Sequence, residues 1–189
     1  NASDFTILHH FTGTDGSYPG GSLTLSGTKL YGMTSEGGDE NGGVLFSIET
    51  NGNNYSVIRH FDNTARGPQG SVILSEGILY GLTKYGGGND SGAAFSYDIA
   101  EDTFTVLGSF TGTNGTYPYG DPIRIGEDLY GMARDGGIIG LGNLFRYSSP
   151  QQWTGVSSTA WSDETNWSKG EVPSGGQDVV IPAAPANQP

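Results

Sequence analysis

Three histidines, His9, His10 and His60, are the side chains of this chain whose ordinary pKa values suit proton transfer near neutral pH. His10 and His60 occupy equivalent positions of an internal repeat, and the third copy has Ser109 there. A catalytic base that acts once should stand outside a repeated pattern, so we interpret these histidines as hydrogen-bonded structural residues. No Gly-x-Ser-x-Gly nucleophile elbow accompanies them. A Ser-His-Asp triad assembled by the fold stays an alternative, but the sequence assigns no catalytic residue.

Two oxygen-rich loops could hold a metal ion. They read Asp39-Glu40-Asn41-Gly42-Gly43 and Gly88-Asn89-Asp90-Ser91-Gly92, at equivalent repeat positions. Calcium prefers carboxylate and carbonyl oxygens, which makes Asp39, Asn41, Asn89 and Asp90 the candidate ligands. Neither loop has the EF-hand spacing or the Gly-Gly-x-Gly-x-Asp nonapeptide, and turns also favour Asn, Asp and Gly. We therefore expect no obligatory cofactor, with plain turns as the simpler interpretation and calcium as the alternative.

Tyrosines in the long Gly/Pro-rich loops are the candidate binding residues: Tyr18, Tyr117 and Tyr119. Exposed aromatic rings stack on sugars or anchor a protein partner, and loops held by a rigid scaffold commonly carry binding residues. The alternative is that Tyr-Pro and Tyr-Gly simply shape the loops. The 20 Asp and Glu residues could also supply the carboxylate pair of a glycosidase, but no pair stands out from the surface charge.

The composition excludes several classes of protein. A net charge of −12 repels a phosphate backbone, so we expect no nucleic-acid partner. Without any cysteine the chain has no disulfide and no thiol nucleophile. No apolar run approaches the roughly 20 residues that span a membrane. The 33 glycines show no Gly-X-Y period and separate short apolar runs, a pattern typical of many short strands joined by turns.

An internal repeat organises the chain. Leu30-Tyr31-Gly32-Met33-Thr34 returns at residues 79–83 and 129–133, so the period is 49 and then 50 residues. Each repeat predicts four strands and no amphipathic helix. The first strand is expected at Phe5–Phe11, where Phe5 and Ile7 share one face and Leu8 lies on the other, so that both faces would be covered. Its copies are residues 55–61 and 104–110.

The other three strands of each repeat follow in order. A second strand is expected at residues 22–25, 71–74 and 122–125, the Leu-Tyr-Gly strand after a tight turn, and a fourth strand at residues 44–48, 93–97 and 143–147. A glycine recurs inside the Leu-Tyr-Gly strand at positions 32, 81 and 131. Glycine in mid-strand indicates close approach of other atoms, as expected for the strand nearest a central axis.

Residues 1–149 are therefore predicted to be all-β and β-propeller-like, with about three four-stranded blades of roughly 50 residues. The chain enters on the Phe5–Phe11 strand and leaves on the strand at 143–147, so these two halves could pair to complete the third blade. Propellers usually have about four to eight blades. The sequence leaves open a longer array, association between chains, or a different closed arrangement of the sheets.

Residues 150–189 differ from the repeats. All three tryptophans, Trp153, Trp161 and Trp167, fall within this segment. Residues 179–181 predict a short strand, and residues 182–189 read as a Pro/Ala-rich tail without structure. We interpret the segment as a small β appendage, a partial second module whose core is formed by the tryptophans.

The repeat resembles the Gloeo/Verruco tandem repeat of large secreted bacterial proteins over residues 5–149. The matching residues are the Phe5–Phe11 segment, Tyr18-Pro19, Leu30–Thr34, Gly37-Gly38 and Gly42–Phe46. The tail from Trp153 to Ile181 is similar to a module of secreted Bacteroidetes-type proteins that often precedes a sorting domain. The resemblance implies export and attachment to a cell surface, and it supplies no catalytic residue.

These observations together predict a non-catalytic, adhesin-like binding or structural module, extracellular or at a bacterial cell surface. Its partners would be a glycan or a surface protein, and self-association is a further expectation. An enzymatic alternative is a polysaccharide lyase or hydrolase that uses a propeller cleft. A third alternative is a structural spacer in a long surface protein.

Overall fold

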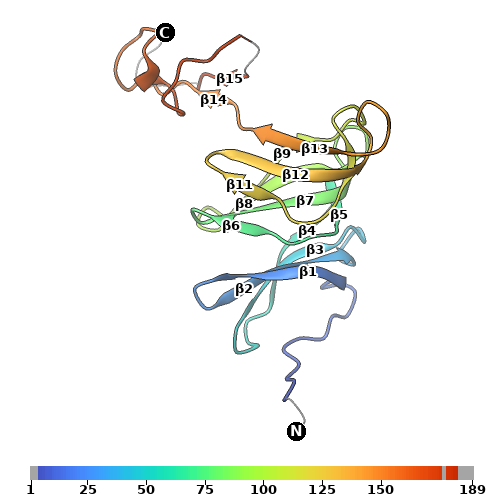
Figure 1. The fold of residues 1–189 in the computed structure, drawn as a ribbon. Helices are drawn as coiled ribbons and strands as arrows, with labels where there is room; N and C mark the ends of the chain where they lie inside the picture. Colours follow the sequence, from blue (N-terminus) through green and yellow to red (C-terminus); the bar gives the residue numbers. More distant parts are fainter. Residues whose placement is uncertain (1–3, 176–177, 183–189) are drawn as a thin grey trace. The chain divides into compact units, whose positions relative to one another are not determined.

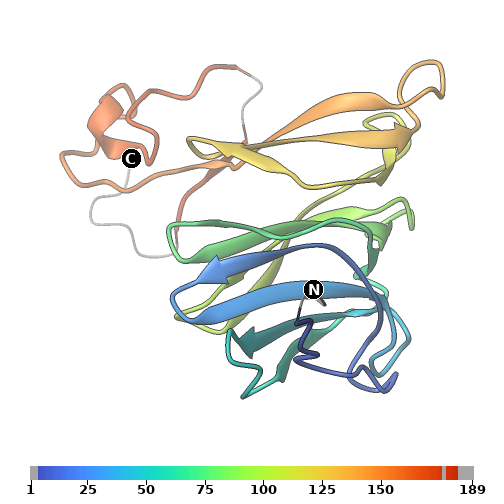
Figure 2. The same ribbon diagram turned by 60° about the horizontal axis from the view of Figure 1, so that its bottom comes forward.

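The computed structural model describes residues 4–175 and 178–182. The chain forms two compact units, Asn1–Tyr147 and Ser148–Pro189, which are described separately (Figures 1 and 2). The tail predicted at residues 182–189 lies outside the described residues from position 183 onward. No helix among the described residues is long and apolar enough to cross a membrane.

The first sheet is an antiparallel meander of four strands. Its order is β1 (Ser17–Ser26), β2 (Lys29–Glu36), β3 (Val44–Glu49) and β4 (Ser56–His60). A tight turn with Gly27 at φ 60° joins β1 to β2, as the predicted hairpin requires. The register of this pair shifts between Gly20 and Thr24, directly after Pro19, which has no N–H to give to the ladder.

The second and third sheets repeat this design with the first strand broken at the same place. The second sheet contains β5 (Ala65–Pro68) and β6 (Ile73–Ser75) on one side of β7 (Ile78–Gly86), then β8 (Ala93–Asp98) and β9 (Thr103–Ser109). The third contains β10 (Thr116–Pro118), β11 (Ile123–Ile125), β12 (Asp128–Asp135) and β13 (Asn143–Ser148). The all-β prediction is confirmed, and none of the described sheets is closed.

The last strand of the first and of the second sheet comes from the following repeat. The segment at residues 55–61 supplies β4 to the first sheet, and the segment at 104–110 supplies β9 to the second. The strand predicted at Phe5–Phe11 is wrong for this reason: residues 4–12 have no sheet to join, form no strand, and leave Phe5 93% exposed. Within the described residues the predicted pairing of residues 5–11 with β13 is absent.

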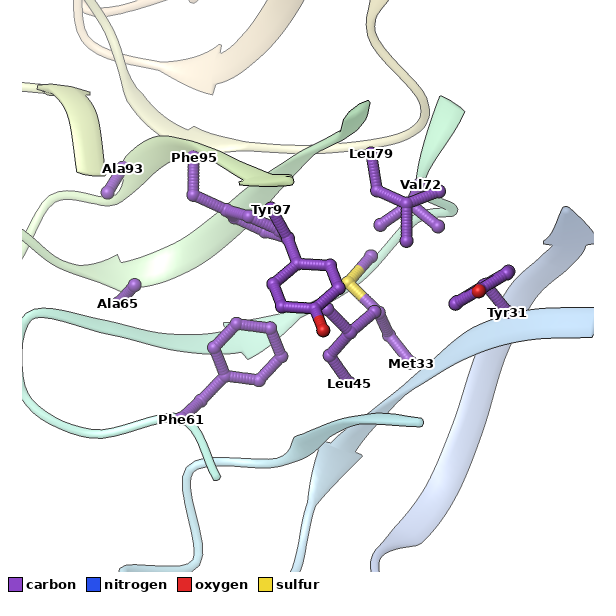
Figure 3. Close-up of a cluster of buried hydrophobic side chains, with 10 residues drawn as sticks. All are labelled: Tyr31, Met33, Leu45, Phe61, Ala65, Val72, Leu79, Ala93, Phe95 and Tyr97. Atoms are coloured by element: carbon purple, nitrogen blue, oxygen red, sulfur yellow. The ribbon is translucent and has the colours of Figure 1, made fainter. Parts of the chain in front are cut away.

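The main core lies between the first and second sheets (Figure 3). Alternate side chains of β2 and β3 point toward it, among them Met33 and Leu45, and Leu79 and Phe95 point toward them from the second sheet. Phe61, in the connection between the sheets, packs on Phe95 at 5.4 Å between ring centroids. Because both faces of the inner strands are covered, their residues are apolar without strict alternation.

The mid-strand glycines make room for an aromatic ring of the neighbouring strand. A Cβ atom on Gly81 would lie 2.4 Å from Cζ of Phe95, and Gly32 and Gly131 face Phe46 and Phe145 at 2.6 Å. The predicted crowding at these glycines is confirmed, and its source is a ring on the neighbouring strand. That the strand lies nearest a central axis stays a prediction.

The backbones of neighbouring sheets also approach each other closely at the broken first strands. A Cβ on Gly21 would lie 2.6 Å from the Gly70 carbonyl, and one on Gly70 would lie 2.3 Å from the Gly120 carbonyl oxygen. We call Gly21, Gly70 and Gly120 the glycine column. A hydrogen bond lies beside it, because the Ser22 N–H donates to Oγ of Ser71 at 2.6 Å. These glycines therefore allow the sheets to pack closely at one end of each first strand.

The C-terminal unit is held by its tryptophans and one buried asparagine. Trp153 packs edge to face on Trp167 and stacks on Trp161, at 5.1 and 5.9 Å between ring centroids. The side-chain oxygen of Asn166 accepts from the N–H groups of Ser157 and Ser158 at 2.9 and 3.1 Å. The regular elements are β14 (Gln151–Gln152), parallel to β15 (Val179–Val180), and the 3-10 helix η1 (Glu164–Asn166).

Candidate functional site

Two of the three candidate tyrosines occupy the same unusual backbone position in different sheets. Tyr18 and Tyr117 have φ angles of 52° and 53°, and the second sheet has Gly67 there at 65°. The N–H of Tyr117 donates to the Ser91 carbonyl of the preceding sheet at 2.8 Å, as Gly67 does to Gly42 at 2.7 Å. Tyr117 is thereby brought against the second sheet, whereas Tyr18, in the first sheet, is 70% exposed.

An aromatic and cationic cluster surrounds Tyr117. Its ring meets that of Tyr85 edge to face, 5.4 Å between centroids. The Arg66 guanidinium lies 4.9 Å and the Lys84 ammonium 4.8 Å from the Tyr85 ring, and Arg134 lies 5.6 Å from the Tyr117 ring. With the neighbouring Tyr119, we call these residues the tyrosine–cation face: Arg66, Lys84, Tyr85, Tyr117, Tyr119 and Arg134.

Strand register explains the cluster. Arg66 on β5 is the cross-strand partner of Tyr85 on β7, so their side chains lie on the same side of the sheet. Lys84 precedes Tyr85, and its long side chain reaches over the same ring. Tyr117 enters from the third sheet through its left-handed backbone position. Two sheets are therefore needed to build this site.

The charges of the face are unevenly compensated. Arg66 pairs with Asp90 at 2.6 Å, and Arg134 pairs with Asp135 at 2.7 Å. No carboxylate of the described residues forms an ion pair with Lys84, whose ammonium lies 4.8 and 5.9 Å from the ring centroids of Tyr85 and Tyr117. Lys84 is therefore available to an anionic group of a ligand.

A polar cavity of about 270 Å³ opens beside this face, lined by Glu36 and Asn41 of the first sheet and by Arg66, Gln69, Lys84 and Tyr85 of the second. Gln69 is oriented by Tyr119, whose hydroxyl donates to its Oε1 at 3.3 Å. The volume is near the lower end of the range for ligand pockets, roughly 300–1,000 Å³. An aromatic wall with amide, carboxylate and cationic groups is suited to a small polyhydroxylated ring.

The candidate metal ligands serve the turns. The side-chain oxygens of Asn41 and Asp90 accept the N–H groups of Gly37 and Gly86 at 2.9 and 2.8 Å. The Asp39 carboxylate is 77% exposed, 3.7 Å from Nδ1 of His60. Asn89 accepts at its carbonyl from the Ser91 hydroxyl at 3.2 Å. Among the described residues no group of three His, Asp or Glu side chains could hold a metal, so calcium here stays a prediction of the sequence.

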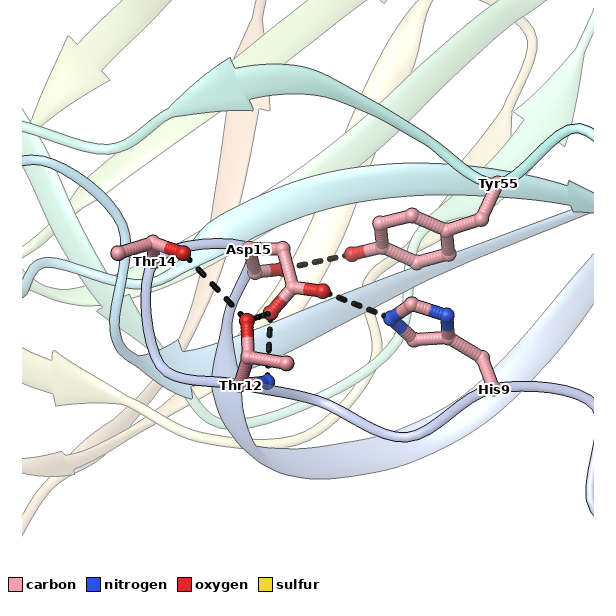
Figure 4. A network of polar contacts seen from close by, with 5 residues as sticks. All are labelled: His9, Thr12, Thr14, Asp15 and Tyr55. Carbon is pink, nitrogen blue, oxygen red and sulfur yellow. Dashed lines mark hydrogen bonds and ion pairs between the residues drawn. The ribbon is translucent and has the colours of Figure 1, made fainter.

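His9 belongs to a separate polar network in the N-terminal segment (Figure 4). Its Nε2 lies 2.9 Å from Oδ2 of Asp15, and its ring stacks on Tyr55 at 3.7 Å between centroids. The hydroxyl of Tyr55 donates to the Asp15 carbonyl at 2.6 Å, and the Thr12 N–H donates to Oδ1 of Asp15 at 2.7 Å. The network fastens residues 9–15 to the end of the first sheet.

The carboxylate of this network performs a turn role that the third repeat performs without charge. There the Asn114 side chain accepts from the Thr111 N–H at 2.7 Å, as Asp15 does from Thr12. Partial burial acts to raise the pKa of Asp15, but hydrogen bonds from Thr12 and His9 outweigh it and hold this pKa below 3.8. The network therefore supports a structural interpretation over an acid–base site.

This lowered pKa gives a pH-dependent contribution to stability. The carboxylate form of Asp15 stabilises the fold above the unfolded-state pKa of about 3.9, and the contribution is lost as the pH falls through the folded-state pKa. In an Asp15→Asn variant we expect unfolding temperatures between pH 5 and 2 to fall less steeply than in the parent chain, with about 0.5–1.5 kcal/mol lost at neutral pH from the His9 contact.

The reciprocal substitution is the control for this prediction. Asn114→Asp places a carboxylate in the same turn of the third repeat, where it should add acid sensitivity without a large change at neutral pH. Thermal unfolding followed by circular dichroism across this pH range measures both variants. Equal pH profiles for Asp15→Asn and the parent chain would contradict the role given to Asp15.

Sequence reasoning missed the central residues of the tyrosine–cation face, Arg66, Lys84 and Tyr85. A signal was present for Tyr85 and Arg66, because each differs in kind from its repeat equivalents, whereas the third-copy equivalent of Lys84 is the cation Arg134. The residues equivalent to Tyr85 in the first and third copies are Glu36 and Asp135. The residues equivalent to Arg66 are Ser17 and Thr116. A residue that occurs in one copy of an otherwise regular repeat indicates a role that the other copies do not share.

A family model described as the Gloeobacter/Verrucomicrobia repeat matches residues 1–177. No curated protein matches the chain.

Proposed function

The chain belongs to the Gloeobacter/Verrucomicrobia repeat family, and from this premise we propose that it is a non-catalytic glycan-binding module of a secreted or cell-surface protein. The ligand is held on the tyrosine–cation face. The three sheets act as propeller-type blades whose loops carry the site. Extracellular location is part of the proposal, supported by the export that the family resemblance implies.

The observation that carries the proposal is the pair of tyrosine rings framed by cations. Tyr85 and Tyr117, whose rings meet edge to face, provide adjoining aromatic surface for the C–H groups of sugar rings. The Gln69 amide, fixed by Tyr119, provides directed hydrogen bonds beside them. A sheet edge that served only as a spacer would need neither the ring pair nor the polar cavity.

The charge of the site narrows the ligand class. Lys84 has no carboxylate partner among the described residues, yet the whole chain carries a net charge of −12. A carboxylate-bearing sugar such as a uronic acid would pair with Lys84 and gain from the nearby guanidinium of Arg66. An acidic polysaccharide is therefore the preferred ligand, with neutral glycans bound more weakly.

Isothermal titration with short oligouronates and neutral oligosaccharides of equal length tests this function. We expect binding of the oligouronate, and a loss of about tenfold in affinity for Arg66→Ala, corresponding to roughly 1.4 kcal/mol. Lys84→Ala should reduce the preference for the acidic over the neutral ligand, because Lys84 is the cation of this face that forms no ion pair with a described residue.

A matched control exists within the chain. Arg59 lies 5.0 Å from the ring of Phe104 and pairs with Asp62, which reproduces the surroundings of Arg66 at a different place. Arg59→Ala should leave affinity unchanged. Equal losses for the Arg59 and Arg66 variants, or no binding of either ligand class, would contradict the proposed site, and release of shortened oligosaccharides would favour an enzyme.

A further inference from the structure

We propose that the outer edge of β13 binds residues 4–10 of a second copy of this chain as an added antiparallel strand, and that two copies do so reciprocally. The proposal does not depend on the ligand of the tyrosine–cation face. The proposal assigns one interaction surface to the third sheet, the edge of β13, and one to the N-terminal segment before the first sheet. Each binds its counterpart in the second copy.

The accepting edge is defined by the other two sheets. β3 and β8 each pair on their outer edge with a strand of the next repeat, β4 or β9. β13 is their equivalent, and in the described part of the chain it pairs only with β12. Phe145 on β13 is correspondingly half-exposed, whereas its equivalents Phe46 and Phe95 are 5% and 0% exposed. An unpaired edge of this kind is a template for another strand.

The donating segment has the sequence of the missing strand. Residues 4–10 occupy the repeat position of β4 and β9, form no strand, and expose Phe5, Ile7 and Leu8 by 93%, 68% and 40%. Alternation would place Phe5 and Ile7 on one face, as in the two internal copies. Strand addition of this type satisfies the backbone groups of both partners while the apolar side chains fill the face beneath.

The internal copies fix the register. β8 pairs with β9 through Ala93 and Ser109, Phe95 and Val106, and Ser96 and Thr105, with an irregularity between Ala94 and Phe95. Translated by the repeat, these pairs become Asn143 with His10, Phe145 with Ile7, and Arg146 with Thr6. The irregularity falls at Leu8, which would turn toward the next sheet as Ile58 does toward the main core.

The outer face of the third sheet also lacks the cover that its equivalents have. Met132 is 64% exposed, whereas Met33 and Leu82 are each 2% exposed. Leu144 is 77% exposed, against 0% for Leu45 and 3% for Ala94. With Tyr119 and Leu141 these residues line an open apolar cavity of about 820 Å³. A first sheet stacked here would bury this surface as the internal sheets bury theirs.

The glycine column points to the same neighbour. Cβ atoms on Gly21 and Gly70 would each collide with the glycine of the next sheet, while Gly120 has no atom within 4 Å. The next member of the column is Gly21 of a following first sheet. A first sheet whose own Leu23 and Leu25 are 53% and 57% exposed therefore fits against the third.

A second copy fits this edge better than the segment of the same copy. Residues 11–15 are fastened to the first sheet: Phe11 packs on Phe46 at 5.4 Å between ring centroids, and the Tyr55 hydroxyl donates to the Asp15 carbonyl. The second sheet lies between them and β13 (Figure 1). Two copies that exchange strands would place six sheets in one ring, within the roughly four to eight blades of propellers. Such a head-to-tail contact forms a closed ring of two copies in which neither the edge of β13 nor residues 4–10 stay unpaired.

The absence of cysteine allows a direct test, because any thiol introduced is the only one. We would mix a T6C variant with an R146C variant and oxidise under mild conditions. Directly opposite residues of antiparallel strands have Cα atoms about 4.5–5.5 Å apart, within the roughly 4.4–6.8 Å that a disulfide spans. We expect a covalent dimer of T6C with R146C, at least tenfold more abundant than in either variant alone. The mixture excludes a bond within one copy.

Two further measurements complete the test. A mixture of T6C with S148C, two residues out of register, should cross-link poorly. The parent chain should sediment at twice its mass of 19.8 kDa, and Ile7→Asp should weaken this dimer at least tenfold with an unchanged circular dichroism spectrum. A monomer at all concentrations, an open ladder of oligomers, or equal cross-linking at Arg146 and Ser148 would overturn the proposal.

Discussion

Replacing Trp153 by alanine should unfold the C-terminal unit, residues 148–189, and leave the sheets of residues 1–147 folded. The Trp153 side chain is fully buried and contacts both other tryptophans. Removing such a ring costs about 3–5 kcal/mol. A unit of this size rarely has more than about 3–5 kcal/mol of stability from its core, so the substitution removes most of what holds it.

The distribution of tryptophan makes the result easy to read. All three tryptophans lie in the C-terminal unit, so their fluorescence reports on this unit alone, and far-ultraviolet circular dichroism reports mainly on the sheets. Trp161→Phe, at a side chain 43% exposed, is the control and should shift the fluorescence transition only slightly. A Trp153→Ala variant with an unchanged transition would show that other contacts hold the unit.

The second large effect is expected from Gly81→Ala in the second sheet. The new methyl group would lie 2.4 Å from Cζ of Phe95, a ring that is fully buried. This ring is fixed between Phe61 and Phe104, at 5.4 and 5.1 Å between centroids, so it cannot move aside without shifting them. Overpacking of this kind costs about 1–3 kcal/mol or more, and we expect the upper part of that range.

The other two mid-strand glycines provide a matched comparison. Gly131→Ala brings its methyl group 2.6 Å from Phe145, but that ring is half-exposed and can turn toward solvent. We expect less than half the cost of Gly81→Ala. Urea unfolding of the two variants measures both free energies. Equal losses would mean that backbone entropy, not the neighbouring ring, determines the effect of these glycines.

Local signals in the sequence were sufficient for most of the strands. Leu30–Thr34 and its copies fall within β2, β7 and β12, because alternation and glycine turns act over a few residues. Phe5–Phe11 has the same pattern as β4 and β9 and yet forms no strand. β4 and β9 form because each pairs with a strand of the preceding copy, β3 or β8. No property of the Phe5–Phe11 segment itself encodes whether such a strand is available to it.

The candidate site was predictable only in part. Tyr117 and Tyr119 stood out because they lie in loops between periodic segments. Tyr85 and Lys84 lie at the end of β7, and inside a strand a tyrosine reads as core. Their role depends on the approach of Tyr117 from the next sheet, which is a tertiary contact. Asn41 and Asp90 illustrate the converse, because their composition suggested metal binding while their hydrogen bonds serve turns.

The sharing of strands between neighbouring repeats bears on how such chains change in length. In the phase set by the sequence repeat, the first and second sheets each end in a strand of the copy that follows, β4 or β9. Excision of 49 or 50 consecutive residues within the array joins two equivalent positions, wherever the cut falls, and creates no additional unpaired edge. Unequal recombination can therefore add or remove one whole sheet at a time, whereas loss of part of a repeat leaves a strand without a partner.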